Sequence, residues 1–192
     1  MTSLFSKNTG SRQLLVDHPL KNGRLCLERE QQSKKMVLYF SVDMEVNHPA
    51  NTIFEQLILG LTDSEKSWLW PIEFEYSPER PAGGVSEGCI LKMVYKVPRF
   101  DKPEIPAKPV CYSYRLTQYK PDQCLFEYTG IDHPLKGGAV VQVLAVDDGR
   151  SRLKWRGAYE QDGSQDLVIN SIIQYFPLLY DTIEEKIIAA EV

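Results

Sequence analysis

The chain has 192 residues, of which 43% are hydrophobic, so it can form one domain with a substantial core. Its formal net charge of −4 argues against a nucleic-acid-binding protein, because such proteins normally carry a basic face. No apolar run is long enough to span a bilayer and the first residues contain no signal-peptide core, so we expect a soluble, cytoplasmic protein.

Residues 1–35 are polar and weakly patterned, and the one element suggested there is a short strand over Gln13–Val16. We expect them to form a partly ordered N-terminal arm ahead of a single domain in residues 36–192. The arm carries seven Lys and Arg against three Asp and Glu. It is expected either to touch acidic membrane surfaces weakly or to be no more than a soluble tail.

The domain begins with a strand over Met36–Val46, which is rich in Val, Tyr and Phe. A helix then starts near Asn47, with Pro49 in its first turn and an apolar face formed by Ile53, Phe54, Leu57, Ile58 and Leu61. Thr62 to Trp68 predicts a second short helix. Strands over Pro71–Ser77 and Glu87–Val97 follow, and Gly88 indicates a bulge or a close backbone approach.

Residues 98–109 contain four prolines and therefore predict a long, semi-rigid loop rather than a central strand. Turn signals at Lys120–Gln123, His133–Gly138 and Asp147–Arg150 then separate the remaining strands. These strands are expected over Val110–Tyr119, Cys124–Ile131, Ala139–Val146 and Ser151–Gln161. The pattern after residue 35 is thus one strand, two short helices, six further strands and a final helix.

The last segment, Ser164–Val192, reads as one long amphipathic helix, kinked at Pro177. Its apolar stripe consists of Val168, Ile172, Phe176, Leu179, Ile183 and Ile187. A helix of about 25 residues would be about 38 Å long and needs an apolar surface of similar length, which a curved antiparallel sheet supplies. Either the helix simply closes the core, or helix and sheet leave a cavity between them.

No catalytic or metal-binding constellation stands out in the sequence. The four cysteines show no C-x-x-C spacing, and each of the three histidines precedes a proline, which places it at a turn or a helix start. There is no glycine-rich phosphate loop, nucleophile elbow or metal-ligand spacing. We therefore assign no catalytic residue and expect neither a metal nor a cofactor.

The order of these elements resembles the helix-grip fold of the START and birch-pollen-allergen superfamily, which includes polyketide cyclases and coenzyme Q-binding proteins. The likeness rests on the strand-to-helix joint Val46–Leu57, on Gly88, on the run Arg152–Tyr159 and on the closing helix, and it covers residues 36–190. It implies an α+β fold in which a curved antiparallel sheet of about seven strands wraps around a long C-terminal helix. It also implies an apolar ligand held between the concave sheet face and that helix, with loops over the entrance.

Strand parity predicts which side chains would line such a cavity. A two-residue turn at Asp148-Gly149 would place Gln142 opposite Trp155, with Tyr159 on the same inner side. Gln142 would then orient a ligand headgroup, or would simply bond Trp155 or a buried water. The predicted ligand-binding residues are Tyr95, Tyr112, Tyr114, Gln142, Trp155, Tyr159, Ile172, Phe176 and Leu179, with Phe100 and His133 as candidates for the entrance.

The orientation of the strand over Val110–Tyr119 stays open. Tyr112 and Tyr114 share one face and Arg115 points to the other, and we favour the tyrosines inward because a buried arginine needs a partner. Were Arg115 inward instead, it would be the polar anchor for a carboxylate or phosphate.

Three functions follow from this sequence. The favoured one is a binding module that sequesters or transports a lipid, polyketide, quinone or similar apolar molecule. The second is a cyclase- or dehydratase-type enzyme that uses the same cavity, which an inward Arg115 or Glu127 would favour. The third is a protein-interaction domain with a filled core and an exposed apolar patch.

Overall fold

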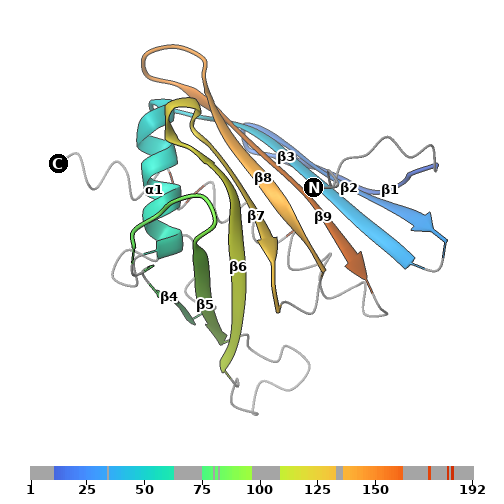
Figure 1. Ribbon diagram of the computed structural model, residues 1–192. Coiled ribbons are helices and arrows are strands. Elements are labelled where there is room, and N and C mark those ends of the chain that lie inside the picture. The colour runs from blue at the N-terminus through green and yellow to red at the C-terminus, as the bar shows by residue number, and fades with distance from the viewer. Residues whose placement is uncertain are drawn as a thin grey trace.

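The computed structural model describes residues 11–33, 35–62, 75–79, 81, 83–96, 109–132 and 136–161, together with Ile173, Asp181 and Ile183. For residues 75–79, 93–96, 109–112 and 161 the description covers the backbone alone. Within these ranges the fold is a single curved antiparallel sheet with one α-helix (Figure 1).

The strands are β1 (Gln13–Leu20), β2 (Gly23–Gln32), β3 (Lys35–Val46), β4 (Glu75–Glu79), β5 (Ile90–Lys96), β6 (Pro109–Lys120), β7 (Leu125–Gly130), β8 (Lys136–Ala145) and β9 (Ser151–Gln161). The helix α1 (Ala50–Thr62) follows β3, and the short 3-10 turn η2 (Pro121–Gln123) joins β6 to β7. The sheet order is β1-β2-β3-β9-β8-β7-β6-β5-β4, with every neighbouring pair antiparallel.

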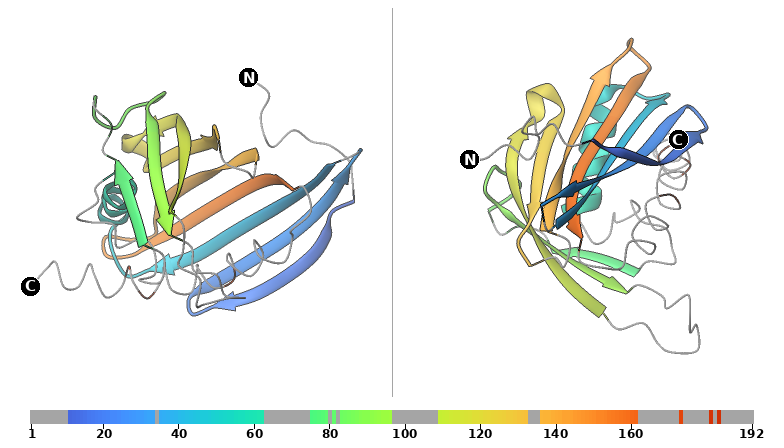
Figure 2. Two further views of the ribbon diagram at one scale, coloured as in Figure 1. Left: turned by 90° about the horizontal axis from the view of Figure 1, so that it is seen from below. Right: turned by 90° about the vertical axis from the view of Figure 1, so that its right-hand side faces the viewer.

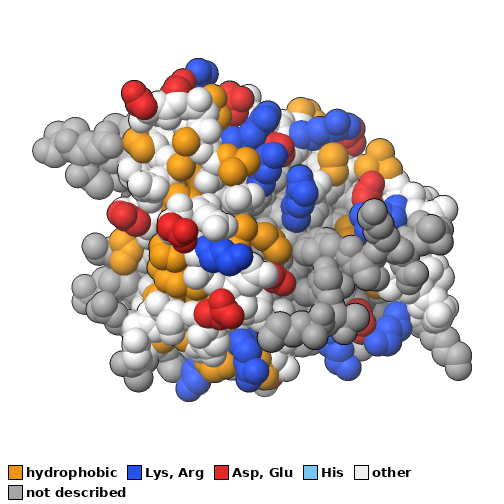
Figure 3. Space-filling view, turned by 45° about the horizontal axis from the view of Figure 1, so that its top comes forward, with side chains coloured by type: hydrophobic (Ala, Val, Ile, Leu, Met, Phe, Trp, Pro, Cys, Tyr) orange, Lys and Arg blue, Asp and Glu red, His pale blue; other side chains and the backbone are white. Residues whose placement is uncertain are grey.

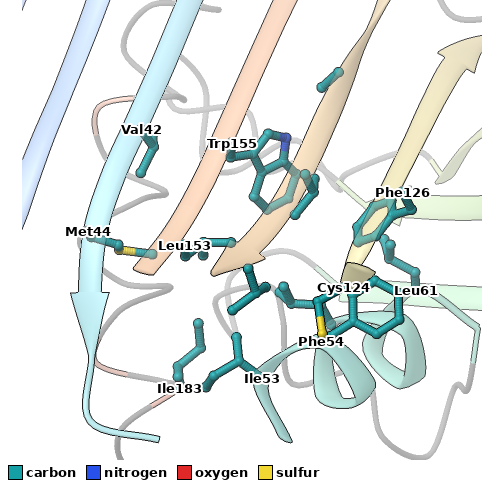
Figure 4. Close-up of a cluster of buried hydrophobic side chains, with 14 of the residues drawn as sticks. Val42, Met44, Ile53, Phe54, Leu61, Cys124, Phe126, Leu153, Trp155 and Ile183 are labelled. Carbon is teal, nitrogen blue, oxygen red and sulfur yellow. The ribbon is translucent and has the colours of Figure 1, made fainter. Parts of the chain in front are cut away.

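The sheet curls strongly, as the two views in Figure 2 show. Alternate residues of its strands face the same side as α1, and we call this side the concave face. The α1 side chains Ile53, Phe54, Leu57 and Leu61 are almost fully buried there. They share one hydrophobic cluster with Phe126, Leu153 and Trp155 from the sheet (Figure 4). This cluster is the core of the fold.

Residues 13–32 form the hairpin β1–β2, whereas the sequence predicted a partly ordered arm with one short strand. β2 pairs with β3 along its whole length, from Gly23 with Met44 to Gln32 with Lys35. Leu25 and Leu27 of β2 are fully buried in the main core. The predicted strand over Gln13–Val16 is therefore the first half of β1, and the hairpin extends the sheet beyond β3.

The seven strands predicted after residue 35 are all present, and β9 has the predicted bounds. The second short helix and the body of the proline-rich loop lie outside the described residues. Gly88 has a φ of +87°, and a Cβ added to it would meet nothing within 4 Å. The glycine is thus needed for its left-handed backbone, and the expected close approach is not the reason.

Most of the predicted C-terminal helix, Ser164–Val192, also lies outside the described residues. The three described positions in it all have helical backbone. Ile183 is fully buried in the main core (Figure 4). Ile173 packs against that core, and Asp181 is exposed. Ile183 belongs to the predicted apolar stripe, so this position has the predicted environment.

Candidate functional site

The concave face has an apolar end and a polar end. At the apolar end, Phe54 of α1 packs on the rings of Tyr119 and Phe126, each with its centroid 6.0 Å away. Further along β7 and β9, away from α1, the concave face carries tyrosines and an arginine. We call this the polar end and define it by Arg29, Tyr114, Tyr128 and Tyr159.

The three tyrosines of the polar end form one contact network. The Tyr114 and Tyr128 rings meet edge to face, with centroids 5.5 Å apart and planes at 87°. The Tyr159 ring stacks on Phe40 at 5.9 Å, with planes at 4°. The Tyr159 hydroxyl donates a hydrogen bond to the Tyr128 oxygen. The Tyr128 hydroxyl proton is then the donor that this network can offer to another molecule.

Burial governs the protonation of these phenols. Burial raises the pKa of Tyr128 to about 12, against the smaller opposing effects of Tyr159 and Trp155, which lower it. The pKa of Tyr159 lies well above its ordinary value, chiefly because of burial and next because of Tyr128 and Tyr114 nearby. Both phenols are therefore neutral at physiological pH and act as hydrogen-bond donors, not as bases.

Glycines make room for the Tyr128 ring. Gly130 of β7 pairs with Tyr114, and Gly137 of β8 pairs with Tyr159. In this row of the sheet, β7 and β8 therefore place no side chain between Tyr114 and Tyr159. A Cβ at Gly137 would also lie 2.0 Å from the Ala158 carbonyl oxygen. The sequence suggested a close backbone approach at Gly88, and the structure has one at Gly137 instead.

Three predicted ligand-binding residues lie together on the concave face, namely Tyr114, Trp155 and Tyr159. Tyr114 is 8% exposed and Trp155 is 5% exposed, whereas Tyr159 is half-buried. The favoured inward orientation of Tyr114 is thus what the structure has. That these residues bind a ligand remains a prediction.

Gln142 lies on the opposite, convex face, because the predicted β8–β9 register is wrong by one residue. Ala145 and Ser151 are the last pair, so the connection has five residues instead of two. The Asp147 carboxylate holds this longer turn by accepting bonds from the Gly149 amide and from the Arg150 guanidinium. Trp155 therefore pairs with Val141, and Gln142 pairs with Lys154.

Arg115 is exposed and lies on the convex face, since its neighbours Tyr114 and Leu116 are buried on the concave one. It cannot be the inward anchor. Tyr95 and Tyr112 are described by their backbones alone, where they pair with Val110 and Met93. The remaining predicted residues lie outside the described ones, and they are Phe100, His133, Ile172, Phe176 and Leu179.

Two residues of the polar end were not predicted. Tyr128 could not be assigned to a face from the sequence, because the β6–β7 register shifts between Leu116 and Gln118 and no sequence signal marks that bulge. Arg29 was missed because β2 was assigned to the arm. The alternation of Leu25 and Leu27 with polar residues in β2 is the signal that could have placed Arg29 on the concave face.

A hollow of about 260 Å³ opens on the convex face. It is lined by Arg12, Cys26, Glu28, Tyr39, Phe40, Ser41, Arg156 and Gly157. Arg12 is already engaged there, because its guanidinium lies 3.8 Å from the Tyr39 ring centre and 3.5 Å from the Glu28 carboxylate. Across the described residues, no three His, Cys, Asp or Glu side chains gather closely enough to hold a metal ion.

Comparisons with known proteins bear on the fold alone. No protein-family profile matches the chain, and no curated protein matches its sequence. Solved structures do match. Ara h 8.0201 has a TM-score of 0.59 at 17% identity, over 80% of this chain and 99% of its own. The Zhui aromatase/cyclase from Streptomyces sp. R1128 has a TM-score of 0.52 at 12% identity, over 76% of this chain and 93% of its own.

Protein Ms6760 from Mycobacterium smegmatis matches more of the chain, with a TM-score of 0.57 at 12% identity over 93% of this chain and 99% of its own. Because this match covers so much of the chain, it must include at least part of the β1–β2 hairpin. Among the described residues, no helix is long and apolar enough to cross a membrane. The strand order, the position of α1 and these likenesses together show that the chain has the helix-grip fold of the birch-pollen-allergen-like proteins.

Proposed function

We propose that the protein binds a largely apolar small molecule, such as a lipid, polyketide or quinone, on the concave face of its sheet. The observation that carries the proposal is the hydrogen-bonded pair of Tyr128 and Tyr159, which lies beside Trp155 on a largely apolar surface. Tyr128 and Tyr159 are half-buried, so they combine a dry setting with residual accessibility. We further propose that the C-terminal helix covers the ligand and that the protein acts in the cytoplasm, by sequestration or transport.

The energetics fit a ligand with one polar end. An apolar ligand that loses about 300 Å² of exposed surface would gain about 7 kcal/mol, at about 25 cal/mol per Å². A hydroxyl donor such as Tyr128 would add about 1 kcal/mol and would mainly fix the orientation of the ligand. The apolar part would lie toward α1, and the polar group would lie at the polar end.

The enzymatic alternative has less support from the chain's own residues. Arg115 and Glu127, the groups that would have favoured it, both lie on the convex face, because Tyr114, Leu116 and Phe126 are buried on the concave one. The concave tyrosines are neutral donors, so they could polarise a carbonyl but could not abstract a proton at neutral pH. Similarity to an aromatase/cyclase supplies fold-level analogy alone.

The interaction-domain alternative also lacks a surface among the described residues. Their exposed large hydrophobic side chains are Leu14, Ile131 and Val146, which come from three separate strands or strand ends. Figure 3 shows hydrophobic side chains interspersed with charged ones of both signs over the face that it presents. No broad apolar patch is seen on that face, as a protein partner would need.

The test is native mass spectrometry of the purified full chain, followed by solvent extraction of any bound molecule. We expect a reproducible extra mass that extracts as an apolar small molecule. Tyr128→Phe should weaken binding of that molecule about fivefold, the value of one hydrogen bond, whereas Gln142→Ala on the convex face should leave it unchanged. A clean unliganded mass, with no shift against a panel of lipids and quinones, would overturn the proposal.

A further inference from the structure

Arg29 is a positively charged residue on the concave face. Its strand neighbours on that face, Leu25 and Leu27, are fully buried, whereas Arg29 itself is half-buried. It pairs with Leu38, and Leu38 pairs on its other side with Tyr159. Arg29 and Tyr159 therefore stand in one row across the sheet, about 10 Å apart, with the fully buried Leu38 between them.

The guanidinium of Arg29 is held from one side. Its Nε donates a hydrogen bond to the Gln13 side-chain oxygen at 2.7 Å. In the part of the chain that the structure describes, its two terminal nitrogens make no hydrogen bond and no ion pair. The bond to Gln13 orients the guanidinium, and its outer edge meets no acceptor among the described residues.

Two other arginines of the sheet, Arg24 and Arg152, have carboxylate partners. Arg24 pairs with Asp17, and Arg152 lies 2.8 Å from the Asp43 carboxylate. These pairs lie at exposed positions, where a salt bridge contributes little. Arg29 is half-buried beside apolar side chains, where a cation without a counter-ion is more costly. None of the described residues on the concave face is an Asp or Glu.

We propose that Arg29 is the counter-ion for the headgroup of the ligand, which is therefore an amphipathic carboxylate. This inference rests on the proposed function. The two terminal nitrogens would bind both carboxylate oxygens in the side-by-side geometry that arginine favours. The carboxylate would lie over Leu38, on the Tyr159 side of Arg29, and the apolar chain would run along the concave face toward α1.

The experiment compares dodecanoate with dodecan-1-ol, two probes with the same chain and different headgroups. Their affinities for the full-length protein are measured at neutral pH by calorimetry. The variants are Arg29→Gln, Arg29→Lys and the control Arg156→Gln, which removes an exposed arginine from the convex face. Thermal unfolding verifies that each variant is folded. Arg29→Lys keeps the charge, so it serves if Arg29→Gln fails to fold.

We expect the wild-type protein to prefer dodecanoate. Arg29→Gln should weaken dodecanoate binding about 10- to 100-fold, as expected for losing charge-assisted hydrogen bonds, and leave dodecan-1-ol unchanged. Arg29→Lys should lose less of its affinity for dodecanoate than Arg29→Gln does. Arg156→Gln should bind both probes as the wild type does. Equal wild-type affinity for the two probes, or an equal loss of both in Arg29→Gln, overturns the headgroup assignment while the proposed function stands. Failure of both probes to bind the wild-type protein overturns the headgroup assignment, and native mass spectrometry then decides the proposed function separately.

Discussion

Gly157 is the residue on which the stacking of Phe40 depends. The two pair across β9 and β3, and a Cβ added to Gly157 would lie 2.0 Å from Cε1 of the Phe40 ring. That ring is 6% exposed and stacks in parallel on Tyr159, so it cannot rotate away without breaking the stack. The missing side chain of Gly157 is thus what lets an aromatic residue lie flat on the sheet next to the polar end.

Gly157→Ala should therefore destabilise the protein by about 1–3 kcal/mol, the usual cost of overpacking a core. The measurement is the free energy of unfolding from urea titration. Gly149→Ala is the matched control, because a Cβ there meets nothing within 4 Å, and it should stay within about 0.5 kcal/mol of the wild type. Replacing Phe40 by Leu in the Gly157→Ala protein should recover part of the loss. Equal losses in the two glycine variants would contradict this reading.

Glu30 is a carboxylate whose ionisation stabilises the hairpin. It is 3% exposed and accepts bonds from the Gln32 amide at 3.0 Å and from the Tyr39 hydroxyl at 2.9 Å. Hydrogen bonds from Gln32 and then from Tyr39 lower its pKa from the ordinary value of 4.5. A lowered carboxyl pKa adds stability above the unfolded pKa, and that stability is lost as the pH falls through the folded one.

Glu30→Gln should therefore be less stable than the wild type at neutral pH, and the difference should disappear as the pH falls below 4.5. Urea titrations at several pH values measure this. Glu28→Gln, which removes a more exposed carboxylate from the same strand, should show a smaller difference at neutral pH. If Glu30→Gln stayed less stable than the wild type in acid, the loss of stability would come from packing rather than from ionisation.

At the scale of elements, the β1–β2 hairpin is an integral part of the core. Leu27 of β2 is fully buried, whereas Leu14 of β1 is 55% exposed. Leu27→Ala should cost about 2–5 kcal/mol because it opens a cavity in a packed core. Leu14→Ala should cost less than about 0.5 kcal/mol. Thermal or urea unfolding of the two variants measures these losses. An unchanged free energy of unfolding in Leu27→Ala would show that the hairpin is separable from the domain.

The elements also show what sequence patterns can and cannot predict. The bounds of β9 and the apolar face of α1 were predictable, because each has a strong period and clear flanking residues. The β8–β9 register was not, because Asp148-Gly149 favours a two-residue turn while Asp147 stabilises a longer one through its bonds to Gly149 and Arg150. A shift of one residue moves a whole strand to its other face, and this is why Gln142 was misplaced.

On the scale of the whole molecule, the concave face changes in chemical character along its length. Core residues around α1 are mainly apolar, whereas the end formed by Arg29, Tyr114, Tyr128 and Tyr159 offers hydrogen-bond donors. Sequence alone could assign Tyr114 and Tyr159 to this face. Arg29 joins them through a hairpin whose pairing with β3 spans distant parts of the fold, and such tertiary contacts carry no local sequence signal.

The added hairpin also changes which strand forms the edge of the sheet. Without it, β3 would present 12 residues of largely apolar strand with unpaired amides to any other chain. The actual edge, β1, has eight residues, an irregular pairing between Leu14 and Val16, and Pro19, which has no amide to offer. Short, bulged, proline-containing edges resist strand addition by other chains. The hairpin thus protects the fold from edge-to-edge aggregation at the side where the sheet would be most exposed to it.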